Sequence, residues 1–155
     1  SMDIQVSSNF ERALFNAYDR DGGAVRQLMD ELKNGGFTIS QGALERLRES
    51  FASGRASEEE TSAMITRALP KMGELLCPHT AIGVHVAEQH LGATPMITLA
   101  TAHPAKFPDA VEAASGIRPS LPARMSDLFD KPERVTRVEN DLSEITALIR
   151  KEIAA

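Results

Sequence analysis

The chain contains few of the features that mark secreted proteins. Its 155 residues include one cysteine, one tyrosine and no tryptophan. One cysteine cannot form a disulfide within the chain, so the sequence excludes the disulfide scaffolds of small secreted domains. The first residues also lack the basic segment and apolar stretch of a secretory signal. We therefore expect a protein of the reducing cytoplasm.

Long apolar runs and basic patches are missing as well. The longest uncharged stretch, between Leu91 and Ala105, is interrupted by glycine and proline and falls short of the roughly 20 apolar residues that a membrane helix needs. The 17 basic residues are scattered among 22 acidic ones, for a net charge of -5. Neither a membrane nor a nucleic acid is therefore an expected partner.

What the chain does contain is hydrophobic periodicity. With 42% hydrophobic residues and no repeat, residues 1–155 are expected to form a single unit. Apolar residues at helical spacing predict a helical part over about residues 8–72, made of four helices. Ser8 with Glu11 suggests a capping box at the first helix, and Ser57 with the acidic residues 58–60 suggests the start of the fourth.

Residues 76–155 are predicted to mix strand and helix. Helices are expected from Pro78 to Gly92, from Pro104 to Ala114, and from Asn140 or Asp141 to the end, with an irregular proline-broken connection before the last. A short apolar run at residues 96–99 is typical of a buried strand. The expected fold class is mostly α with two or three short strands. Because one strand cannot satisfy its own backbone groups, this pattern indicates part of a larger protein.

The most informative stretch is MITLATAHPAKF, residues 96–107. It predicts a strand, a polar turn that begins near Thr101, and a helix that Pro104 can open because proline lacks an N–H group. In open α/β sheets ligands bind beyond the carboxyl ends of strands. The turn is therefore where we expect chemistry.

Three blocks of the sequence resemble a known family. They are SMDIQVSSNFER (residues 1–12), PHTA (residues 78–81) and TAHPAKF (residues 101–107), and together they are similar to the C-terminal portion of threonine synthase. Threonine synthase is a pyridoxal-phosphate enzyme of the tryptophan-synthase-β fold type (fold type II). The resemblance covers essentially the whole chain, but only about the last third of a family member.

The resemblance implies a cofactor role for Thr101. In this fold type a Ser or Thr hydroxyl at that position faces the pyridine nitrogen of pyridoxal phosphate. A neutral hydroxyl does not stabilise a protonated ring as a carboxylate does, so elimination or replacement is favoured over transamination. From the residues alone, the favoured interpretation of Thr101 is a threonine at a strand end whose hydroxyl bonds to nearby backbone.

Other residues of these blocks are weaker candidates for substrate binding. His103 and Lys106 belong to the same turn, but a histidine bonded to backbone and a solvated lysine explain them as well. In the first block, Ser8 and Asn9 remain as candidates. The family usually has an acidic residue where this chain has Cys77, which we interpret as a small, semi-buried residue and a weaker helix cap.

The sequence offers no metal site and no complete catalytic set. His85 and His90 lie about 140° apart on the predicted helix, by the roughly 100° per residue of an α-helix, so His79, His85, Glu88 and His90 cannot share one zinc ion. The family's Schiff-base lysine and glycine-rich phosphate loop belong to segments that precede this part. We therefore expect no catalytic residue in the chain, and a fragment that is inactive and binds no cofactor alone.

The predicted function is that of the parent enzyme, with the missing N-terminal part of the same protein and an amino-acid substrate as partners. The parent would convert O-phospho-L-homoserine and water to L-threonine and phosphate. Two alternatives stay open. One is another fold-type II pyridoxal-phosphate lyase, and the other is an independent helical interaction module without catalysis.

Overall fold

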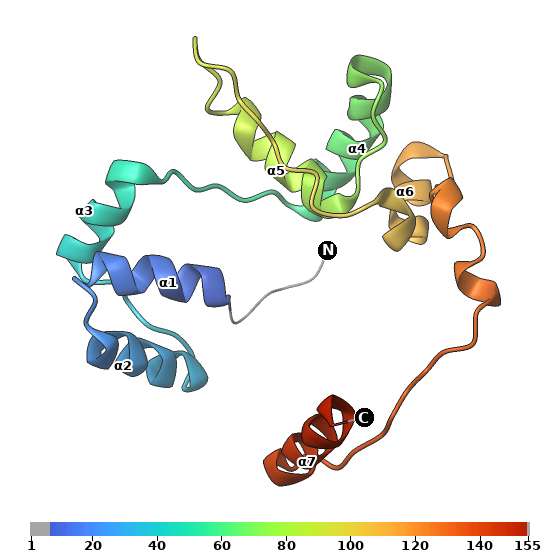
Figure 1. Cartoon of the computed structure of the whole chain (residues 1–155). Helices are drawn as coiled ribbons and strands as arrows, with labels where there is room; N and C mark the ends of the chain where they lie inside the picture. The colour runs from blue at the N-terminus through green and yellow to red at the C-terminus, as the bar shows by residue number, and fades with distance from the viewer. Residues whose placement is uncertain (1–6, 155) are drawn as a thin grey trace. The chain divides into compact units, whose positions relative to one another are not determined.

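The computed structural model describes residues 7–154, and within this range the chain is helical (Figure 1). The first six residues of the SMDIQVSSNFER block lie outside the described range. Contacts divide the chain into a unit that ends at Pro119 and a second unit that begins at Ser120. None of the described helices combines the length and the apolar character needed to cross a membrane. The single unit expected for residues 1–155 stays a prediction.

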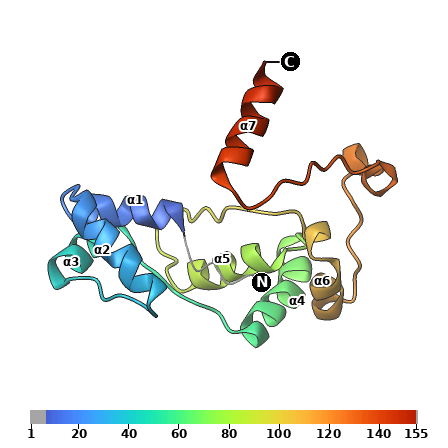
Figure 2. The same ribbon diagram turned by 90° about the horizontal axis from the view of Figure 1, so that it is seen from below.

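The first three helices form one small cluster, in which α1 packs against both α2 and α3 (Figure 1, Figure 2). They are α1 (Ser8–Ala17), α2 (Gly22–Lys33) and α3 (Gln41–Ser50). Leu14, Ala17 and Leu28, which the helical spacing selects, are buried. In α3 the buried residue is Ala43, whereas the expected Leu44 and Leu47 are half-buried and Phe51 is exposed. The expected helical part of the chain is therefore confirmed here.

In this cluster the start of α1 differs from the predicted one, whereas α3 has the predicted Ser40 as its N-cap. α1 has Ser7 as its N-cap, with no hydrogen bond from that side chain, so the predicted capping box of Ser8 and Glu11 is wrong: the helix begins one residue too early for it. Asp21, whose side chain accepts from the N–H groups of Gly23 at 2.8 Å and Ala24 at 3.1 Å, caps α2. An aspartate at this position satisfies two of the free donors of a helix start.

The second cluster holds the largest core and consists of α4 (Glu58–Met72), α5 (Pro78–Glu88) and α6 (Pro108–Ser115) (Figure 1). The predicted start of α4 is confirmed, because Ser57 and Glu60 form a capping box. The buried side chains that the three helices share are Met64, Ile65, Ala68, Leu76, Ala81 and Val111. Leu75, Val84, Phe107 and Ala114 pack around them.

Two helices near the turn differ from the sequence predictions. α5 ends at Glu88, before Gly92. The helix predicted from Pro104 to Ala114 is interrupted, because a 3₁₀ turn η1 (Pro104–Lys106) precedes α6. Pro108 causes the break: it has no N–H group to donate to the carbonyl of Pro104, as a continuous α-helix would require.

The predicted strand at residues 96–99 is not formed in this chain. Within residues 7–154 no segment pairs as a strand, and residues 95–100 have no regular secondary structure. A strand needs a neighbour for its N–H and C=O groups, and the described chain supplies none. The two or three short strands of the expected fold class are therefore absent from the described residues, while the mostly helical character is confirmed.

The second unit contains two 3₁₀ turns, η2 (Ala123–Met125) and η3 (Leu128–Asp130), followed by α7 (Leu142–Ile153). Asp141 caps α7, because its side chain accepts from two backbone N–H groups of the first turn. No residue of α7 is buried. Its apolar residues Leu142, Ile145, Ile149 and Ile153 are exposed, and Leu148 is half-buried.

Candidate functional site

The turn that the sequence selects, residues 101–107, lies between the irregular segment after α5 and the start of α6 (Figure 1). Thr101 is exposed. No hydrogen bond joins its hydroxyl to any residue in the described part of the chain, so the backbone-bonded alternative is not observed there. Its donor and both of its acceptor lone pairs are therefore available for another group.

His103 and Lys106 occupy the same turn in different ways. His103 is the N-cap of η1, and its Nδ1 accepts a hydrogen bond from the N–H of Ala105 at 3.2 Å. This is the backbone-bonded role that the sequence left open for it. Lys106 is exposed, and its Nζ lies 5.7 Å from the ring centroid of Phe107. A cation at that distance from an aromatic face is weakly attracted to it and stays available to an anion.

The start of α5 lies beside this turn. Cys77 is the N-cap, and its Sγ accepts from the N–H of Thr80 at 3.4 Å and lies 3.2 Å from the hydroxyl of Thr80. Its role as a cap is thus as expected, but the side chain is only 1% exposed, so the expected semi-buried position is wrong. The cysteine packs at the edge of the core because Leu76 and Pro78 on either side are buried too.

His79 joins α5 to the turn. Its ring centroid lies 4.9 Å from that of Phe107, with the two planes tilted by 49°. Offset or tilted aromatic pairs at this distance attract each other by about 0.5–1.5 kcal/mol beyond the area that they bury. Because Phe107 also packs on the core, this pair fixes the end of the 101–107 turn to the helix cluster.

The Nδ1 atom of His79 is the exceptional polar atom of this region. It is buried and has no hydrogen-bond partner in the described chain. Leaving such an atom unsatisfied costs about 1–3 kcal/mol. The sequence offered no signal for it, because it depends on how α5 and the turn pack together.

The segment before the turn contacts α5 at Gly83. A Cβ atom on Gly83 would lie 3.2 Å from Cγ2 of Thr98, so the absence of a side chain lets the two segments approach. The apolar residues on either side of Thr98 face solvent: Ile97 is 82% exposed and Leu99 is 74% exposed.

The histidines and acidic residues of α5 make structural contacts. Glu88 pairs with Arg67 at 2.7 Å and Lys71 at 3.3 Å on α4, and the hydrogen bond from Arg67 lowers the pKa of Glu88 below its usual value. His85 Nε2 lies 3.8 Å from Glu60. In residues 7–154 no three His, Cys, Asp or Glu side chains gather as metal ligands would.

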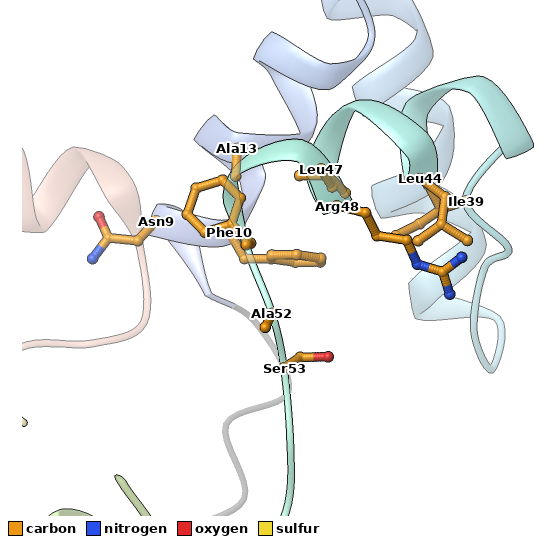
Figure 3. A pocket seen from close by; sticks show the side chains of 10 residues that line it. Asn9, Phe10, Ala13, Ile39, Leu44, Leu47, Arg48, Ala52 and Ser53 are labelled. Carbon is orange, nitrogen blue, oxygen red and sulfur yellow. The ribbon is translucent and has the colours of Figure 1, made fainter. Parts of the chain in front are cut away.

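Asn9 lies elsewhere, at an apolar pocket between α1 and α3 (Figure 3). Its side-chain oxygen accepts a hydrogen bond from Arg12. The pocket has a volume of about 600 Å³ and is lined by Asn9, Phe10, Ala13, Ile39, Leu44, Leu47, Arg48, Phe51, Ala52 and Ser53. The sequence indicated apolar faces here but not a cavity, because Phe10 and Phe51 stay 44% and 63% exposed instead of closing it.

Comparison with known proteins gives one consistent result. Residues 80–149 match the family model described as "Threonine synthase, C-terminal". The chain is 45% identical to a threonine synthase of Pseudomonas aeruginosa in an alignment of 153 positions that covers 96% of this chain and 33% of that protein. It is 34% identical to a threonine synthase of Saccharomyces cerevisiae in an alignment of 181 positions that covers 99% of this chain and 35% of that protein.

Solved structures agree with these relatives. The crystal structure of a PLP-bound threonine synthase from Brucella melitensis matches with a TM-score of 0.79 and 51% identity, over 99% of this chain and 34% of that one. The yeast threonine synthase structure matches with a TM-score of 0.68 and 33% identity, over 99% and 35%. The chain therefore spans about a third of the length of the relatives that it matches.

Proposed function

We propose that this chain is the C-terminal part of a threonine synthase, an enzyme that converts O-phospho-L-homoserine and water to L-threonine and phosphate. The observation that carries the proposal is the match over 99% of the chain, at 51% identity, to a threonine synthase solved with its cofactor bound. The chain contributes one wall of the site, and the preceding part of the same cytoplasmic protein contributes the rest.

The residues of the 101–107 turn are compatible with pyridoxal phosphate. Thr101 has an exposed hydroxyl with no partner among the described residues, so it is free to bond to a ring nitrogen. When bound, the cofactor withdraws electrons from the substrate. The neutral hydroxyl of Thr101 beside the ring nitrogen would limit that withdrawal. Elimination and replacement would therefore be favoured over transamination.

Further roles are proposed for the neighbouring side chains. Lys106 carries an exposed ammonium group, which can attract the phosphate or carboxylate of the substrate. His103 orders the turn through its bond to Ala105 and leaves Nε2 to face the substrate. Asn9 is a third candidate for substrate binding. In the complete protein, residues 96–99 pair as a strand, which covers the exposed Ile97 and Leu99.

Complementation tests the proposal. The chain is mixed with the separately produced preceding part of the protein, and cofactor absorbance, threonine and phosphate are measured. We expect both parts alone to be inactive and the mixture to be active. The matched control is the same mixture with the Schiff-base lysine of the preceding part replaced by alanine, which removes turnover but leaves association of the parts.

Two other outcomes would contradict the proposal. Two folded parts that associate but bind no pyridoxal phosphate would make the chain an interaction module. A mixture that binds the cofactor but releases no phosphate from O-phospho-L-homoserine would identify a different pyridoxal-phosphate lyase.

A further inference from the structure

We propose that His79 is a positioning residue for the 101–107 turn: its ring holds Phe107 in place, and its buried Nδ1 is hydrogen-bonded to a polar group of the complete protein that the described chain does not contain. The proposal rests on the proposed function, because it assigns the turn to the cofactor site. It adds a residue from a different helix, which has no contact of its own with Thr101.

The ring contact links two elements that are separate in sequence. His79 lies in the first turn of α5, and Phe107 lies at the junction of η1 and α6. Phe107 is the last residue of the turn and packs on the core, whereas Thr101 at the other end is exposed. A change in the Phe107 ring therefore displaces the turn at its anchored end. Displacements of about 1 Å at a reacting group can reduce turnover by about 100-fold.

The buried nitrogen makes His79 different from its neighbours. Cys77 and Thr80 satisfy each other, and Nδ1 of His103 is bonded to backbone. Among the described residues of this region, Nδ1 of His79 is the buried side-chain polar atom left without a partner. Buried imidazoles usually have one nitrogen bonded, because that bond fixes the tautomer and the direction of the ring. A partner from the preceding part would set the ring against Phe107 as the protein assembles.

Two substitutions distinguish the contribution of the His79 ring from that of its Nδ1 atom. His79→Phe keeps an aromatic ring against Phe107 but removes Nδ1. His79→Asn places an amide near the position of Nδ1 but removes most of the ring. The matched control is His90→Phe, because His90 is an exposed histidine just after the same helix. All are made in the complete protein, and activity is expressed per bound cofactor.

We expect both His79 variants to lose about tenfold or more in kcat with little change in KM, and the absorbance maximum of the bound cofactor to shift, while His90→Phe stays at wild type. Loss of stability alone would reduce the amount of cofactor bound without changing kcat per bound cofactor or the absorbance maximum. A double-mutant cycle of His79→Asn with Phe107→Leu should be non-additive, because both act on one contact.

The same measurements of kcat and cofactor absorbance show which results would overturn the proposal. Wild-type kcat and absorbance in both His79 variants would overturn the proposal. Wild-type behaviour of His79→Phe alone would overturn the hydrogen bond at Nδ1 and leave the ring contact. A complete wild-type protein that binds no pyridoxal phosphate would overturn the proposed function instead, before any variant is compared.

Discussion

Gly83 offers a direct test of whether residues 96–99 are held in place by the rest of the protein. It lies inside α5, and a Cβ on it would lie 3.2 Å from Cγ2 of Thr98. Carbon atoms pack best about 3.5–4.0 Å apart, so Gly83→Ala requires Thr98 to move by about 0.3 Å or more. The effect of the substitution depends on whether Thr98 can move.

Two energies of opposite sign decide the result. Alanine in place of glycine inside a helix stabilises the folded state by about 0.8–1 kcal/mol. Overpacking a contact that cannot relax costs about 1–3 kcal/mol. In this chain alone Thr98 belongs to an irregular segment and can move, so we expect Gly83→Ala to raise the free energy of unfolding by about 0.5–1 kcal/mol.

In the complete protein the outcome should reverse. A paired strand at residues 96–99 cannot shift, so the same substitution should lower the unfolding free energy by about 1 kcal/mol net and displace Thr101, three residues further on. Gly83→Val should lower the unfolding free energy further, because its two methyl groups enlarge the steric overlap with Thr98. The assay is denaturant unfolding of both proteins, together with the rate of threonine formation in the complete one.

Gly42 is the matched control, because it lies in helix α3 and a Cβ on it would meet no atom within 4 Å. Gly42→Ala should stabilise both proteins and leave the rate of threonine formation unchanged. If Gly83→Ala stabilises the complete protein as it does the chain, and both Gly83 variants keep the full rate, then residues 96–99 are not fixed and their proposed strand is refuted.

Three further predictions concern a helix cap, the cofactor and pH. Ser57→Ala removes the capping box of α4 and should lower the unfolding free energy of the chain by about 1 kcal/mol, measured by denaturant unfolding; no loss would contradict the cap. Thr101→Asp in the complete enzyme should shift products toward transamination, and an unchanged ratio of threonine to keto acid would remove Thr101 from its proposed role. Glu88→Gln should destabilise the chain at neutral pH by less than about 1 kcal/mol, because both ion pairs are partly exposed. The pKa of folded Glu88 lies below its ordinary 4.5, so this difference is present above that value and disappears as the pH falls through the folded pKa; a difference that persisted in acid would have another cause.

The helices could be predicted because the side chains that define them are buried within this chain. Leu14, Leu28 and Met64 follow the 3.6-residue period, and each is buried against a neighbouring helix close in sequence. Their ends were less predictable. Whether Ser7 or Ser8 caps α1 depends on a shift of one residue in the backbone hydrogen bonds, and whether Pro104 or Pro108 opens α6 depends on a shift of one turn.

The position of the candidate site along the chain could be predicted from the sequence, but the contacts between its side chains could not. The small residues and proline after an apolar run indicated the turn at Thr101, and the structure leaves that residue exposed. The pair of His79 and Phe107 and the pocket beside Asn9 could not be predicted in the same way, because each joins helices that are distant in sequence. Periodicity identifies which face is apolar, but it does not identify which residue that face will meet.

The features that the chain leaves unsatisfied have a common explanation. Ile97 and Leu99 are apolar and exposed, the apolar residues of α7 are not buried in their own unit, and Nδ1 of His79 is buried without a partner in the described residues. Such features are costly in a protein that functions alone, because exposed apolar surface promotes association and an unpaired buried nitrogen destabilises the fold. The relatives that the chain matches are about three times as long. Under the proposed function, the residues that this chain lacks supply the missing contacts. Under the proposed function, the cofactor contact at Thr101 lies on a surface that the preceding part of the protein closes.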